Sequence, residues 1–142
     1  MEARILVADD VPDIVDAVQM VLETDGYVVT TICDGTRVIP LMHEQAPDLL
    51  LLDIWMSGSD GREICQQIKQ QEALCHIPVL LMSAHREAPD MAEQAGADGY
   101  ILKPFTMNTL LATVATTLQK QQEEQLLTPG IKLTRNANRS ID

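Results

Sequence analysis

The chain has 142 residues, of which 46% are hydrophobic, so it is long and apolar enough to fold around one buried core. Its 10 basic and 21 acidic residues give a net charge of −11, which disfavours direct binding to the phosphates of nucleic acids. No apolar run approaches the ~20 residues of a membrane span, and the first residues, MEARILVADD, do not resemble a signal peptide. We therefore expect a cytoplasmic protein that does not bind membranes.

The first segments of the chain alternate between apolar strands and amphipathic helices. Residues 4–8, RILVA, form a short apolar run that predicts a strand. Residues 13–24 place apolar side chains at helical spacing, and residues 27–32, YVVTTI, are β-branched and typical of a strand. A second helix is expected over residues 37–45, RVIPLMHEQ, where Pro40 should bend or shorten it because proline lacks a backbone N–H.

The middle of the chain repeats this alternation around its most apolar run. Residues 48–53, DLLLLD, predict a buried strand that ends in a carboxylate. Asp60 is placed to cap a helix over residues 61–71, and residues 78–82, PVLLM, predict the next strand. An unpaired carboxylate directly behind an apolar run is costly to bury, so Asp53 requires either a partner or a site that opens to solvent.

The last elements complete the alternation. Residues 90–95 predict a short helix, and residues 99–102, GYIL, predict the fifth strand. Thr106 is expected to cap the last helix, MNTLLATVATTLQK. We expect one domain over residues 1–120, followed by residues 121–142 as an extension of the last helix and a loosely ordered, Gln- and Asn-rich tail.

Five strand–helix repeats predict an α/β fold. Strands that are apolar throughout, each followed by an amphipathic helix, indicate a parallel sheet covered on both faces. Because crossovers between parallel strands are right-handed, the expected architecture is a doubly wound five-stranded parallel sheet in a three-layer sandwich.

Charged and polar residues follow four of the predicted strands. Asp9 and Asp10 follow the first strand, Asp53 ends the third, Ser83 follows the fourth and Lys103 follows the fifth. The carboxyl ends of parallel strands lie at one edge of a sheet, which is where ligands bind in such folds. We therefore expect three carboxylates, one hydroxyl and one ammonium to converge.

This combination favours phosphoryl transfer. Three adjacent carboxylates raise one another's proton affinity or require a cation, and Mg²⁺ prefers oxygen ligands. A carboxylate beside Mg²⁺ can attack phosphorus and form an aspartyl phosphate, with Lys103 neutralising charge and Ser83 donating to a phosphoryl oxygen. The alternative is that Asp9, Asp10, Asp53 and Lys103 form only a salt-bridge cluster.

Four segments of the chain occur in one order: ILVADD, LLLLDIWMSGSDG, VLLMSA and GADGYILKPF. Together, over residues 4–118, they resemble the receiver domain of bacterial two-component response regulators, in particular single-domain, chemotaxis-regulator-like members. The resemblance implies a flavodoxin-like (βα)5 fold. It also implies that Asp53 accepts a phosphoryl group, with Mg²⁺, from a histidine kinase or a histidine phosphotransfer protein.

The resemblance implies further roles at the site. Asp9, Asp10, Asp53 and the backbone carbonyl of Trp55 would bind Mg²⁺. The Ser83 hydroxyl and the Lys103 ammonium would contact the phosphoryl group.

The resemblance also implies a conformational switch and residues that control the lifetime of the phosphoryl group. Ser83 and Tyr100 would move on phosphorylation and reshape the face formed by the fourth helix, fifth strand and fifth helix, for output to a downstream protein. Trp55 and His85 flank the site at positions that tune the lifetime of the phosphoryl group, although Trp55 is equally well interpreted as an aromatic packed on its loop. The Lys103–Pro104 bond is usually cis in this family.

Two features depart from the family pattern. Position 57 is serine where the family usually has proline, and beside Gly58 this loop is expected to be more mobile. The segment HREAPDMAEQ is short, so its helix should have only about two turns.

Several alternatives remain open from the sequence. We expect a stand-alone receiver, monomeric or weakly dimeric, that signals through protein contacts; the alternatives are part of a longer regulator or hybrid histidine kinase, and a receiver-like module that works without phosphorylation. A flavodoxin-like electron carrier would need a phosphate-binding loop where Asp9 and Asp10 stand. An aspartyl-phosphate hydrolase would need an acid where Trp55 stands. We therefore expect a phosphoacceptor signalling domain rather than an enzyme acting on other substrates.

Overall fold

A five-stranded parallel sheet forms the centre of the computed structural model, which describes residues 2–126. The strand order is β2-β1-β3-β6-β7, and all four pairings are parallel. The strands are β1 (Arg4–Ala8), β2 (Val28–Ile32), β3 (Leu49–Asp53), β6 (Val79–Ser83) and β7 (Gly99–Leu102). This doubly wound, flavodoxin-like sheet confirms the predicted fold class, and each strand lies where the apolar runs or, for β2, the β-branched residues placed it.

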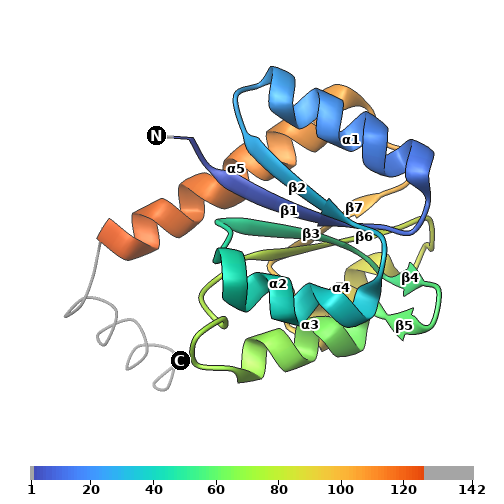
Figure 1. The fold of residues 1–142 in the computed structure, drawn as a ribbon, viewed down its shortest axis with the longest axis vertical. Coiled ribbons are helices and arrows are strands. Elements are labelled where there is room, and N and C mark those ends of the chain that lie inside the picture. Colours follow the sequence, from blue (N-terminus) through green and yellow to red (C-terminus); the bar gives the residue numbers. More distant parts are fainter. Residues whose placement is uncertain (1, 127–142) are drawn as a thin grey trace.

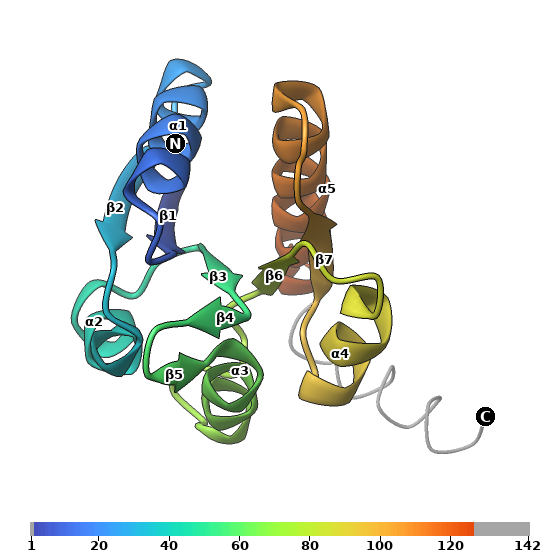
Figure 2. The ribbon, with the colours of Figure 1, turned by 90° about the vertical axis from the view of Figure 1, so that its right-hand side faces the viewer.

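Helices cover both faces of the sheet. The helices are α1 (Pro12–Thr24), α2 (Val38–Gln45), α3 (Gly61–Gln70), α4 (Ala88–Ala95) and α5 (Met107–Leu126), with a short 3₁₀ helix, η1 (Gly35–Arg37), before α2. Figures 1 and 2 show α1 and α5 on one face and α2, α3 and α4 on the other. Within residues 2–126, none of these helices has both the length and the apolarity to cross a lipid bilayer.

The two faces have separate apolar cores that share the strands. Leu50 and Leu52 of β3 pack in the cluster under α2, α3 and α4, whereas Leu49 and Leu51 pack in the cluster under α1 and α5. All four are fully buried. Each buried leucine stabilises the fold by about 1.5–3 kcal/mol relative to an exposed one, so β3 is anchored from both sides and holds Asp53 in a fixed position.

Side chains cap two helices as the sequence predicts. Asp60 Oδ1 accepts a hydrogen bond of 2.9 Å from the backbone N–H of Arg62, at the start of α3. Thr106 Oγ1 accepts one of 3.0 Å from Thr109 N, in the first turn of α5. The helix after β6 is short, as expected: α4 has 8 residues, or about two turns.

Pro40 lies in the first turn of α2, where it removes no hydrogen bond. The first four N–H groups of a helix have no partner inside the helix, so proline is tolerated there. The helix is nevertheless short, as expected. The segment is divided into η1, which Asp34 caps, and α2, which has 8 residues.

One element was not anticipated, and it lies directly after β3. Residues 55–60 form a small antiparallel hairpin of β4 (Trp55–Met56) and β5 (Ser59–Asp60), with Gly58 at φ +74° in its turn. The last helix continues past residue 120 to Leu126, in line with the expected helix extension. Residues 127–142 lie outside the described residues, so the division into 1–120 and 121–142 stays a prediction.

Candidate functional site

The residues that follow the predicted strands meet at one edge of the sheet. Asp9 follows β1, Asp53 is the last residue of β3, and Lys103 follows β7. Ser83 ends β6, which lies between β3 and β7. The strand order reverses between β1 and β3, and this is where ligands bind in open parallel sheets. Figure 2 is viewed from this edge.

One ammonium group bridges two buried carboxylates at this edge. Lys103 Nζ lies 2.7 Å from Asp9 Oδ2 and 3.3 Å from Asp53 Oδ1. Asp9 is fully buried and Asp53 is 5% exposed. Asp10 adds a third carboxylate, and oxygen atoms from the three aspartates lie within 4.8 Å of one another. The cluster therefore holds more negative charge than Lys103 neutralises.

The surroundings of Asp53 oppose its ionisation. Burial raises the pKa of its carboxyl group above the usual value, and the negative charge of Asp9 raises it further. The charge and hydrogen bond of Lys103 act in the opposite direction but do not cancel the rise. A carboxylate that is costly to ionise in this pocket gains from a bound cation.

Asp10 lies in different surroundings because Ser57 caps it. The backbone N–H and the hydroxyl of Ser57 both donate to Asp10 Oδ2, each at 2.7 Å. These two hydrogen bonds hold the pKa of the Asp10 carboxyl group below its usual value, the hydroxyl making the larger contribution. Both hydrogen bonds therefore favour the ionised form of Asp10.

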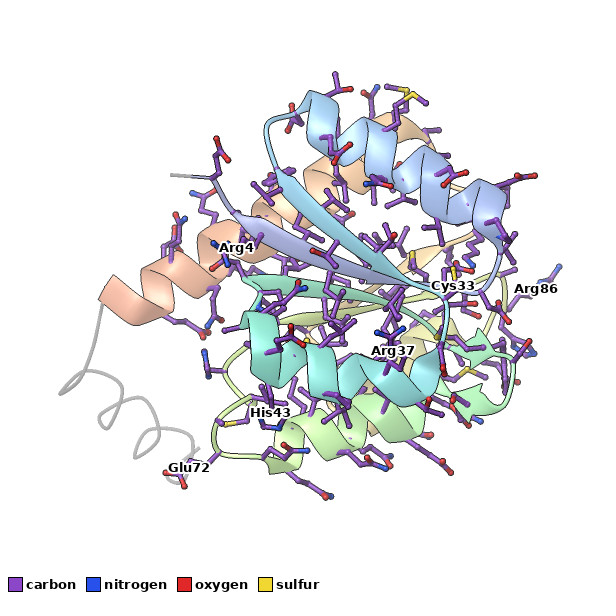
Figure 3. All side chains as sticks on the ribbon, viewed as in Figure 1. Arg4, Cys33, Arg37, His43, Glu72 and Arg86 are labelled. Carbon is purple, nitrogen blue, oxygen red and sulfur yellow. The ribbon has the colours of Figure 1, made fainter. Side chains whose placement is uncertain are left out.

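The Ser83 hydroxyl is buried at the same edge, where it is 1% exposed. Its oxygen accepts a hydrogen bond of 2.9 Å from the backbone N–H of His85. That bond uses an acceptor site of the hydroxyl and leaves its own hydrogen to be donated. The next residue, Arg86, extends away from the molecule into solvent (Figure 3), so this cation does not neutralise the pocket.

The three carboxylates fit a hard divalent cation. Mg²⁺ prefers oxygen ligands and commonly uses one or two carboxylates together with waters. Asp9, Asp10 and Asp53 supply carboxylate oxygens at one point, and the single lysine leaves negative charge to be neutralised. The donor set thus agrees with the predicted magnesium site.

Residues 5–115 match the family model described as the response regulator receiver domain. The chain belongs to this family. The DNA-binding response regulator MtrA of Mycolicibacterium smegmatis is 31% identical over 126 residues, which cover 87% of this chain and 54% of that protein. This receiver domain thus spans just over half the length of the curated relative.

Solved structures of other response regulators share the fold. The chemotaxis response regulator CheY4 of Vibrio cholerae is 27% identical, with a TM-score of 0.78, over 82% of this chain and 99% of that chain. NtrX from Brucella abortus is 31% identical, with a TM-score of 0.82, over 89% of this chain and 29% of that chain. Family membership makes the chain a signalling domain of a two-component system.

The remaining predicted residues of this receiver domain, Trp55, Tyr100 and His85, are exposed. The Trp55 ring is 50% exposed, and the Arg62 guanidinium carbon lies 4.8 Å above its centroid. Tyr100, on the edge strand β7, is 39% exposed. His85 is exposed and contacts Ser83 only through its backbone N–H. The Lys103–Pro104 bond is cis, as the resemblance implied.

The sequence analysis missed three residues that shape the receiver pocket. Ser57 caps Asp10, and Gly58 allows the hairpin turn that brings Ser57 there. Gly61 approaches the backbone of Asp53 so closely that an added Cβ would collide with the Asp53 carbonyl oxygen. The two glycines in DLLLLDIWMSGSDG were a visible signal of close backbone approach. Nothing marked Ser57 as a partner of Asp10, and the predicted mobility of its loop stays a prediction.

Proposed function

We propose that Asp53 is the phosphoacceptor of this receiver domain. The proposal rests on one observation: a buried carboxylate at the end of β3 shares an ammonium group with Asp9 and lies in a cluster with Asp9 and Asp10. In a salt-bridge cluster with no further chemistry we would expect balanced charges. This cluster has an excess of carboxylates instead.

The reaction is an in-line displacement at phosphorus. An oxygen of Asp53 forms the new O–P bond while the bond between phosphorus and the donor group breaks. With a phosphohistidine donor, the departing imidazole nitrogen keeps the electron pair and can take up a proton. Because phosphoryl transfer depends on positioning and charge neutralisation, the role of the protein is to hold Asp53 and Lys103 in place.

The residues of this chain share the stabilisation of the phosphoryl group. Lys103 already contacts Asp53 and would also reach a phosphoryl oxygen on it, and the buried Ser83 hydroxyl has a hydrogen to donate. Asp9, Asp10, Asp53 and the backbone carbonyl of Trp55 would hold Mg²⁺. When bound, that ion neutralises the charge of the aspartates and of the phosphoryl oxygens.

The signal would leave through the edge of the sheet that contains β7. Movement of Ser83 toward the phosphoryl group would open space for Tyr100, which is partly exposed on the neighbouring strand β7. In the register of these strands Ser83 pairs with Leu102, and Tyr100 lies two residues earlier, opposite Leu81. The face of α4, β7 and α5 would then change shape and meet a downstream protein. Leu102 on the same strand is 44% exposed, which suits a protein contact.

The partners follow from this chemistry. A histidine kinase or histidine phosphotransfer protein would donate the phosphoryl group, and output would pass by protein contact in the cytoplasm, from a monomer or weak dimer. Direct contact with nucleic acid is not part of the proposal, because the net charge is −11. We propose that the domain signals alone. The second candidate is a receiver within a longer regulator, which is favoured by the relative MtrA, named DNA-binding, of which this chain covers 54%.

Trp55 and His85 would set the lifetime of the phosphoryl group. Trp55 follows the phosphoacceptor by two residues and is half exposed, and a bulky ring there would hinder attacking water. The Arg62 contact supports the packing interpretation as well. A dephosphorylation rate that is unchanged in Trp55→Ala would exclude shielding by the ring.

Intact-mass measurement tests the phosphoacceptor directly. Wild type, Asp53→Asn and Asp34→Asn would each be treated with acetyl phosphate and Mg²⁺. Asp34 is an exposed aspartate that caps η1, so its variant is a matched control. We expect wild type and Asp34→Asn to gain one phosphoryl group and Asp53→Asn to gain none. Equal gain by all three would place the acceptor elsewhere, and no gain by any would favour a module that works without phosphorylation.

A further inference from the structure

Ser57 makes an unusual contact with the acidic cluster. Its backbone N–H and its hydroxyl both donate to the same oxygen, Asp10 Oδ2, each at 2.7 Å. The two residues are 47 positions apart, and Ser57 lies between β4 and β5 in the hairpin that follows Asp53. Among residues 2–126, these two hydrogen bonds are the ones that join the hairpin 55–60 to Asp10.

Ser57 is the hydrogen-bond partner of Asp10, whereas Lys103 is the partner of the other two aspartates. Lys103 forms its ion pairs with Asp9 and Asp53, whereas Asp10 is more exposed and has Ser57. Neutral donors hold a carboxylate in one orientation without adding positive charge to the cluster. Asp10 is thereby oriented while the cluster keeps its excess of negative charge.

The arrangement also divides the two oxygens of Asp10 between two tasks. Both Ser57 donors use Oδ2, so Oδ1 receives neither of them, and we expect it to be the oxygen that binds a cation. A hydrogen bond from outside the ligand set commonly orients a metal ligand in this way. The same contact fixes the hairpin, whose first residue, Trp55, would offer its carbonyl to the same ion.

We propose that Ser57 is a positioning residue that pre-orders Asp10 and the 55–60 hairpin for Mg²⁺. The inference rests on the proposed magnesium site. It assigns to Ser57 a part of the Mg²⁺ affinity that proline at this position could not supply, because proline has neither an N–H nor a hydroxyl.

Mg²⁺ affinity provides the test, since it can be measured without any phosphoryl donor. Trp55 is the only tryptophan of the chain and lies in the hairpin, so its fluorescence can follow a Mg²⁺ titration. Binding of Mn²⁺, measured by electron paramagnetic resonance, gives a second readout that does not depend on the tryptophan. Thermal unfolding in EDTA would establish that each variant is folded.

Four variants separate the donors. Loss of an outer partner commonly weakens metal binding 10–100-fold, so we expect Kd for Mg²⁺ to rise about tenfold in Ser57→Ala and about 100-fold in Ser57→Pro. Ser57→Thr keeps both donors and should bind like wild type. Ser59→Ala removes the neighbouring hydroxyl of the hairpin, which packs against Gly35 rather than Asp10, and should also bind like wild type.

The outcomes distinguish this inference from the proposed function. If wild type binds Mg²⁺ and Ser57→Ala binds it equally well or more tightly, the positioning role is wrong and the magnesium site stands. An equal loss in Ser59→Ala would also overturn it, because the effect would then belong to the hairpin in general. If wild type itself binds neither Mg²⁺ nor Mn²⁺, both the site and the role of Ser57 fail.

Discussion

Two lysine–aspartate pairs lie at opposite ends of the sheet, and the distance from the lysine nitrogen to the carboxylate oxygen is the same in both. At the carboxyl edge Lys103 lies 2.7 Å from Asp9, and at the amino ends of β6 and β7 Lys69 lies 2.7 Å from Asp98. Their surroundings differ. Lys69 Nζ also donates to the carbonyl oxygen of Ile77, and Asp98 Oδ2 also accepts from the backbone N–H of Val79.

The difference is one of charge balance. The pair of Lys69 and Asp98 has one charge of each sign, with backbone groups as its further partners, so it ties α3 to the starts of two strands. Lys103 faces two buried carboxylates with a third nearby, so that pair needs a cation or a substrate. Distance alone does not separate a structural ion pair from a reactive one, whereas the count of charges and their partners does.

The largest expected effect is on phosphorylation at the reactive pair. In Lys103→Met the rate of phosphoryl uptake should fall about 10²–10³-fold, the usual consequence of losing one group that stabilises transition-state charge. Lys69→Met should react at the wild-type rate. Initial rates by intact mass, with acetyl phosphate and Mg²⁺, compare the two. Equal rates in both variants would remove the distinction between the pairs.

The second effect is on stability at the structural pair. Lys69→Met should lower the free energy of unfolding by about 1–3 kcal/mol, the range for removing one hydrogen-bond partner, because Asp98 and the Ile77 carbonyl lose their shared donor. Urea denaturation measures this. Lys120→Met, at an exposed position of α5, is the control and should stay within about 0.5 kcal/mol of wild type.

The third effect is on the melting temperature, Tm, and it has opposite signs at the carboxyl edge and at the pair of Lys69 and Asp98. In EDTA at neutral pH, Asp53→Asn should raise Tm by a few degrees, the scale on which about 1 kcal/mol shows in a domain of this size. Asp98→Asn should lower Tm, because it weakens the bond from Lys69. A fall of Tm in both would mean that Asp53 is stabilising and that the pocket holds no excess charge.

The pH dependence of the Asp53 variant follows from the raised pKa of that carboxyl group. The folded protein holds the Asp53 proton more tightly than the unfolded chain does, so stability from this group falls as pH rises from the unfolded-state pKa through the raised one. The advantage of Asp53→Asn should therefore be full above the raised pKa and absent below the unfolded-state pKa. Thermal melts across acid pH check the sign.

The smallest effect belongs to a third pair, on the surface. Arg62 lies 2.7 Å from Asp60, with side chains 35% and 25% exposed, and also contacts the Trp55 ring. Arg62→Ala should cost under about 1 kcal/mol in unfolding free energy, since exposed pairs are screened by water. Urea denaturation gives the value, and a larger loss would mean that the contact with Trp55 holds the hairpin in place.

Most of the fold and much of the site could be read from local patterns. Apolar runs predicted four of the five strands, because strands of a parallel sheet covered on both faces are largely apolar, and β-branched residues predicted the edge strand β2. The position of Asp53 at the end of DLLLLD predicted its place at the carboxyl edge. The caps at Asp60 and Thr106 followed equally from residues close in the sequence.

The contacts within the pocket could not be read in this way. The bond from Ser57 to Asp10 joins residues 47 positions apart, and that from Lys103 to Asp9 joins residues 94 apart. Their geometry depends on how the hairpin of β4 and β5 folds over the sheet edge, and two-residue strands leave too short a pattern to predict. The need for Gly61 against the Asp53 carbonyl likewise appears only when the chain is folded.

The sequence by itself determined which side chains stand at the ends of the strands, because strand periodicity and the parallel topology fix the edge that each one reaches. Only the tertiary structure decided how the charges are shared: Lys103 with Asp9 and Asp53, and Ser57 with Asp10. The physical reason is that hydrogen bonds and ion pairs act over a few ångströms, and packing of the whole chain sets distances on that scale.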